Sequence, residues 1–176
     1  MANKLRTAQA EVKGFTLTEV LITIVIVGIL SAVALPNYFR QVQRTRQNEA
    51  AATLAQLLSI VAAYDDEYRS PPTTWKDLSD ITAVMTDSGP AAAGNGILTD
   101  NITLPGGHYQ VSRNTPNNGS YYIFMAAPMP VQASTQDYNV MACVDLVTGA
   151  SDVKIGTRDD SADADAQIEA ADLTCQ

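Results

Sequence analysis

The sequence predicts an α+β fold in which one long N-terminal α-helix packs on a small antiparallel β-sheet of about four strands. Three observations lead to this prediction. Residues 15–39 are almost continuously apolar, and residues 50–68 carry an apolar stripe at helical period. Residues 109–155 contain short strand candidates separated by turn signals, and residues 138–146 alternate between apolar and polar side chains. A chain of 176 residues leaves room for one modest globular domain beside the apolar segment.

The first element is an uncharged run from Val20 to Phe39. As a helix this run would be about 30 Å long, which matches the hydrocarbon core of a bilayer. One carboxylate, Glu19, stands at its N-terminal edge. Because a charge within a membrane segment is costly, we expect Glu19 to have a cationic partner. The alternative is that headgroups at the membrane interface solvate Glu19.

The residues before the run supply a candidate partner. Residues 1–14 are polar and carry more basic than acidic side chains. Cleavage after Gly14 would leave a free α-amino group on Phe15, which could neutralise Glu19 of the same chain or of another chain. The rival interpretation is an ordinary secretory cleavage after Ala34, because residues 32–34 form an A-x-A pattern.

The segment KGFTLTEVLITIVIVGILSAVALPNY, residues 13–38, resembles the N-terminus of type IV pilins and pseudopilins. The shared pattern is a short basic leader that ends in Gly14, followed by Phe15, by Glu19 and by the apolar run. Gly28 and Pro36 also stand where the family has a glycine and a proline. The close match ends near residue 46, and the remainder agrees only in layout.

The resemblance implies that a prepilin peptidase cuts between Gly14 and Phe15 and methylates the Phe15 amine. The subunit would wait in the inner membrane as a single-span protein. The pilus assembly machinery would then draw it into a helical homo-oligomer on the cell surface, where Glu19 pairs with the amine of a neighbour. Gly28 and Pro36 would mark a helix kink, although Pro36 could instead end the membrane helix.

The sequence predicts three segments. They are a cleaved leader at 1–14, a helix at 15–68 whose part 15–39 is the membrane or filament-core segment, and a globular head at 69–176. The stripe on the second half of the helix consists of Ala50, Leu54, Leu57, Val61, Tyr64 and Tyr68. Pro71 ends the helix, and the pattern Thr74-x-x-Asp77 predicts a short helix at 75–80 with Trp75 as a packing anchor.

The head is predicted to be mainly β-structure. Residues 82–107 should form a long loop with one short strand at 96–98. Strands are expected at 109–113, 121–126, 138–146 and 151–155, with a hairpin turn at Asn118-Gly119. The apolar face of this sheet would lie on the helical stripe.

The C-terminal part contains both cysteines of the chain, Cys143 and Cys175. Beyond a membrane anchor the compartment is oxidising, so we expect them to form a disulfide that closes the C-terminal region. The tail at 156–176 is acidic and could bind calcium, but it lacks the ligand order of an EF-hand, and a solvated loop is the simpler interpretation. We predict no metal and no cofactor.

The sequence contains no catalytic constellation, which predicts that the protein is not an enzyme. His108 is the only histidine, and no phosphate loop or nucleophile motif accompanies it. The formal net charge of −8 argues against sequence-independent binding of nucleic acid. The leading hypothesis is therefore a type IV pilus subunit. The alternatives are a pseudopilin of a type II secretion or DNA-uptake machine, located in a periplasmic pseudopilus, and a membrane-tethered binding protein.

Overall fold

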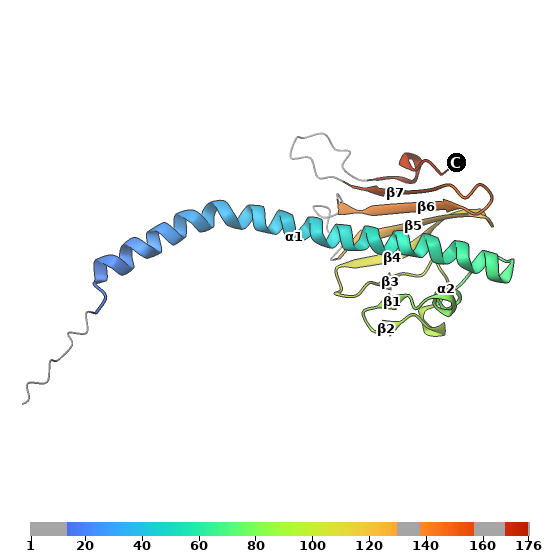
Figure 1. Cartoon of the computed structure of the whole chain (residues 1–176), viewed down its shortest axis with the longest axis horizontal. Coiled ribbons are helices and arrows are strands. Elements are labelled where there is room, and N and C mark those ends of the chain that lie inside the picture. The colour runs from blue at the N-terminus through green and yellow to red at the C-terminus, as the bar shows by residue number, and fades with distance from the viewer. Residues whose placement is uncertain (1–13, 130–137, 157–167, 176) are drawn as a thin grey trace, which may run out of the picture. The chain divides into compact units, whose positions relative to one another are not determined.

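The structure is a computed structural model that describes residues 14–129, 138–156 and 168–175 (Figure 1). The chain divides into two compact units, Met1–Gln41 and Val42–Gln176. Helix α1, Leu17–Tyr68, contributes to both units. The α+β fold is as predicted.

The described part of the first unit is almost entirely helical. Between Val20 and Leu35 the large apolar side chains point outward on all sides of α1, with exposed fractions of 50–68%. A helix that is apolar all round requires an apolar environment outside itself. Among the described residues, α1 is long and apolar enough to cross a membrane. Pro36 lies inside α1 and does not end it.

In the second unit, α1 buries most of the predicted stripe. Ala50, Leu54, Leu57 and Val61 are at most 2% exposed. The prediction is wrong at Tyr68, which is 53% exposed in the last turn of the helix. Its ring lies against the Tyr64 ring, with the centroids 4.5 Å apart, and does not enter the core.

The short helix α2, Trp75–Ile81, forms where the capping pattern predicts it. The Thr74 hydroxyl accepts a hydrogen bond from the Asp77 amide (3.1 Å), and the Asp77 carboxylate accepts one from the Thr74 amide (2.8 Å). These bonds satisfy amides that the first helical turn leaves without intrahelical partners. Trp75 is fully buried, and its indole N–H donates to the Asp100 carbonyl (2.9 Å).

The main sheet has five strands and not the four that we expected. All neighbours are antiparallel, in the order β3-β4-β5-β6-β7 (Figure 1). The strands are β3 Ile102–Thr103, β4 Tyr109–Asn118, β5 Tyr121–Pro128, β6 Val140–Asp145 and β7 Ser151–Ile155. The additional strand, β3, pairs with Val111 and Gln110 of β4. It is two residues long, which is too short for an alternating pattern to reveal.

Two further details of the β-structure differ from the prediction. The β4–β5 connection consists of Gly119 and Ser120, because β4 extends to Asn118, which pairs with Tyr121. The expected strand at 96–98 is a single bridge between Ile97 and Thr74. The long loop also holds a small hairpin, β1 Met85–Thr86 with β2 Gly89–Pro90, and a 3-10 turn, η1 Ala93–Asn95.

The sheet is covered on both faces. One face packs on α1 and α2, and its fully buried members include Tyr122, Phe124 and Val111. The other face carries Tyr121, Ile123, Met141 and Cys143, which pack against the C-terminal segment 168–175. That segment contains the short 3-10 turn η3, Ala170–Asp172. The second unit therefore consists of helix, sheet and C-terminal segment in layers.

Candidate functional site

The N-terminus of α1 is built around a pair of side chains, Thr16 and Glu19. The Glu19 atom Oε2 accepts hydrogen bonds from the Thr16 amide (2.8 Å) and the Thr16 hydroxyl (2.7 Å). The Glu19 amide in turn donates to the Thr16 hydroxyl (3.2 Å). This arrangement is a capping box, in which N-terminal amides find partners in the side chains of the first turn.

Sequence reasoning missed this role for Thr16. It assigned Glu19 to an external cation, although the spacing Thr16-x-x-Glu19 is itself the sequence signature of a capping box. The structure thus gives Glu19 a partner within its own helix. Both bonds that the carboxylate accepts reach the same oxygen, Oε2. A cation could therefore approach Oε1 while the cap stays in place.

The remaining predicted residues of this segment lie as follows. Gly14 and Phe15 precede the first helical residue, Leu17, and Phe15 is 90% exposed. Gly28 and Pro36 lie within α1, and a Cβ added at Gly28 would meet nothing within 4 Å. Cleavage after Gly14, methylation of Phe15 and a kink at Gly28 and Pro36 stay predictions.

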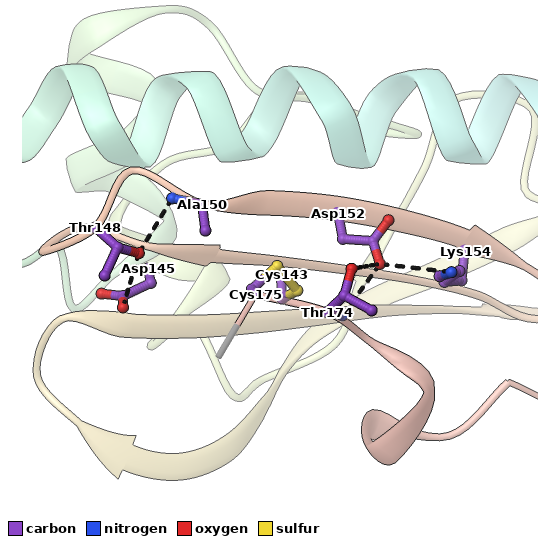
Figure 2. The surroundings of a disulfide bond; sticks show 8 residues. All are labelled: Cys143, Asp145, Thr148, Ala150, Asp152, Lys154, Thr174 and Cys175. Carbon is purple, nitrogen blue, oxygen red and sulfur yellow. Dashed lines mark hydrogen bonds and ion pairs between the residues drawn. A yellow bond between two sulfur atoms is a disulfide. The ribbon is translucent and has the colours of Figure 1, made fainter.

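In the head, Cys143 of β6 and Cys175 of the C-terminal segment form a disulfide, with their Cα atoms 6.1 Å apart (Figure 2). Beside it, Asp152 of β7 accepts hydrogen bonds from the Thr174 hydroxyl (2.8 Å) and the Thr174 amide (3.1 Å). The hydrogen bond from the Thr174 hydroxyl lowers the pKa of Asp152. The disulfide and the hydrogen bonds from Thr174 to the Asp152 carboxylate thus hold the C-terminal segment against the sheet.

A second set of polar contacts holds the start of the same segment. The Asn139 side chain donates to the Ile168 carbonyl (2.7 Å) and accepts from the Ile168 amide (3.0 Å). The Asn139 backbone makes a further contact: Gln47 of α1 donates hydrogen bonds to the carbonyls of Gly156 (2.6 Å) and Asn139 (3.3 Å). Gln47 is only 4% exposed, so its amide joins α1 to the end of the sheet through buried hydrogen bonds.

The head offers no arrangement that resembles catalytic machinery in its described parts. His108 lines a groove of about 170 Å³ together with Arg46, Glu49 and Tyr109. Burial raises the pKa of Tyr109 to about 12, and its hydroxyl donates to the Tyr138 carbonyl (2.9 Å). Among residues 14–129, 138–156 and 168–175, no three potential metal ligands gather. Of the acidic tail 156–176 that was considered for calcium, residues 157–167 and 176 lie outside these ranges.

The fold and the capped N-terminus define a class of protein. Its described residues include one exposed apolar helix with a polar start, and this helix continues into an α+β head with a disulfide. Such a protein can associate through its helix with a membrane or with other helices.

Comparison with known proteins identifies the family. The family model for the prokaryotic N-terminal methylation motif matches residues 11–35. The fimbrial protein EcpC of Eikenella corrodens is 32% identical over 124 residues, which cover 62% of this chain and 78% of that protein. The chain therefore belongs to the type IV pilin and pseudopilin family.

Two further relatives are a secretion protein and a pilin. The type II secretion system core protein G of Escherichia coli is 27% identical over 118 residues, which cover 66% of this chain and 81% of that protein. The type IV major pilin protein PilA of Myxococcus xanthus is 38% identical over 55 residues, but these cover only 31% of this chain and 25% of PilA. None of the solved structures compared gives a significant match.

Proposed function

We propose that this protein is a structural subunit of a type IV pilus, inserted in the inner membrane before assembly and polymerised through its N-terminal helix. The observation that carries the proposal is the combination of an apolar helix exposed on all sides with one carboxylate in its first turn. The similarity to fimbrial proteins supports this function. The leader would be residues 1–14, the assembly helix residues 15–68 and the head residues 69–176.

Glu19 would set the position of one subunit against the next. In a filament core the carboxylate would leave water, and an unpaired buried charge is strongly unfavourable. After cleavage by a prepilin peptidase, the Phe15 amine of a neighbouring subunit would supply the compensating charge. Thr16 would hold Oε2 of Glu19, and the amine would bind at Oε1.

Substitution of Glu19 tests this role. Glu19→Ala should leave the subunit in the inner membrane but reduce its amount in sheared pili by about tenfold or more, since the amine of the neighbour would then be buried without a partner. Glu67→Ala, which removes an exposed carboxylate near the C-terminal end of the same helix, should assemble normally. Normal piliation of the Glu19→Ala variant would contradict the role proposed for Glu19.

The N-terminus of the mature chain tests the proposal at an earlier step. Mass spectrometry of purified subunit should find a chain that begins at Phe15 and carries one methyl group on its amine. A chain that begins at Met1 would refute the proposal, because no amine would then have been created at Phe15. A chain that begins after Ala34 would also refute it, because Glu19 would have been removed.

The second candidate function is that of a pseudopilin. The observation that favours it is the alignment with the secretion protein G, which spans 81% of that protein. A pseudopilin would use the same helix but would form a periplasmic pseudopilus. Electron microscopy of shear fractions distinguishes the two, because long surface filaments that contain this subunit support the pilus. Their absence, together with a secretion defect in a deletion strain, would favour the pseudopilus.

A further inference from the structure

The apolar segment of α1 ends in two aromatic residues and an arginine, Tyr38, Phe39 and Arg40, which we name the collar. The Tyr38 and Phe39 rings are 63% and 62% exposed and meet edge to face, with their centroids 5.9 Å apart. Arg40 is also exposed, and it is the first charged residue after Glu19. All three residues belong to the first unit of the chain.

The arrangement of the collar around the helix indicates what surrounds it. Successive residues of an α-helix are rotated by about 100°, so the three side chains point in directions that span about 200° of the circumference. A single protein partner would contact one face of α1 and leave the others exposed, as they would be in a subunit that is not yet surrounded by other subunits. A bilayer interface surrounds the helix, and it is there that amphipathic rings and arginine side chains are favourable, because the rings contact both apolar and polar groups while the guanidinium reaches the phosphates.

The spacing along the helix agrees with this environment. Glu19 and Phe39 are separated by 20 positions, or about 30 Å along the axis, which equals the thickness of the hydrocarbon core. The capping box of Thr16 and Glu19 and the collar are therefore polar ends of one apolar span. When the collar lies at one interface, Glu19 reaches the opposite interface.

We propose that the collar binds the phospholipid headgroup layer on the outer side of the inner membrane and fixes the depth of the unassembled subunit. This inference rests on the membrane insertion that the proposed function requires. Its consequence is that Glu19 stays among headgroups and water until assembly. The cost of burying the carboxylate then arises on transfer into the filament, where the neighbouring amine offsets it.

Depth-dependent fluorescence quenching tests the proposal. The mature full-length chain, in vesicles of phosphatidylethanolamine and phosphatidylglycerol, would carry either Tyr38→Trp or Ile29→Trp. Ile29 lies midway between Glu19 and Phe39 and is the matched control for the bilayer centre. Trp75, buried in the head, contributes the same background to both variants. The quenchers are phospholipids brominated either near the headgroup or near the end of the acyl chain.

We expect the shallow quencher to reduce the Tyr38→Trp emission about threefold more than the deep quencher, and the reverse for Ile29→Trp. Deep quenching at both positions, or no quenching at position 38, would overturn the collar proposal alone. No quenching at position 29 would show that the helix is not inserted, and the proposed function would fail with it. Loss of quenching at position 38 as the protein-to-lipid ratio rises would show that a second copy covers the collar, which also overturns the proposal.

A second experiment tests whether the collar sets the depth. In the Ile29→Trp chain, Tyr38→Leu with Phe39→Leu and Arg40→Gln should shift the ratio of deep to shallow quenching by about twofold, because the helix could then slide along the membrane normal. The matched control is Tyr64→Leu with Tyr68→Leu, which removes an aromatic pair from the last turns of α1, in the second unit, and should leave the ratio unchanged. An unchanged ratio in the collar variant would overturn the proposal.

Discussion

Removal of the disulfide should destabilise the head mainly through the unfolded state. The bond joins residues 32 positions apart, and the chain-entropy relation for a loop of this length gives about 4 kcal/mol at room temperature. Both cysteines are at most 1% exposed. We therefore expect Cys143→Ala with Cys175→Ala to lower the free energy of unfolding by roughly 3–4 kcal/mol.

Urea titration of the mature protein in detergent measures this loss. Trp75, the only tryptophan, is buried in the core on the opposite face of the sheet from the disulfide, so its fluorescence reports unfolding of the head. Because the effect acts on the unfolded chain, the amides of Ile168 and Thr174 should stay protected from hydrogen exchange in the native variant. A loss below about 1 kcal/mol, or rapid exchange of both amides, would refute this reasoning.

Two further substitutions test the polar contacts of the head. Gln47→Leu should cost about 1–3 kcal/mol of stability in the same titration, because the buried Gly156 carbonyl loses its 2.6 Å partner, while Gln56→Leu on the exposed face of α1 should cost far less. Equal losses would exclude a special role for Gln47. Asp152→Asn should destabilise the head at neutral pH but not in acid. The folded pKa of Asp152 is lowered by Thr174, so its contribution is complete above about pH 4, the usual pKa of aspartate, and disappears as the pH falls through the lowered value. A stability difference that does not change between neutral and strongly acidic pH would contradict this assignment.

Local patterns in the sequence predicted the elements whose physics is local. The uncharged run is visible in the composition, and the stripe from Ala50 to Val61 is visible from its helical period. Both segments lie in α1, as predicted. The capping box at Thr74 and Asp77 placed α2 correctly because all of its bonds lie within four residues. The box at Thr16 was equally visible, but the carboxylate was interpreted as the partner of the Phe15 amine, of the same chain or of another, or as solvated by headgroups.

Features that depend on contacts between distant residues were not readable from the sequence. β3 is a strand only because Ile102 and Thr103 pair with β4, and two residues carry no periodic signal. Gln47 looks like any polar helical residue until the ends of β6 and β7 bring two carbonyls to its amide, 92 and 109 positions away. The cover over the second face of the sheet likewise forms only when the C-terminal segment packs on Tyr121, Ile123 and Met141.

The sequence by itself therefore determined the exposed apolar helix, its acidic start, the β-rich head and the pairing of its two cysteines, because each follows from composition or from spacing within a few residues. The tertiary structure decided the number of strands, the buried hydrogen bonds of Gln47 and the packing of the C-terminal segment on the second face of the sheet. These depend on which distant backbone groups come within hydrogen-bonding distance, and only the folded chain sets that distance.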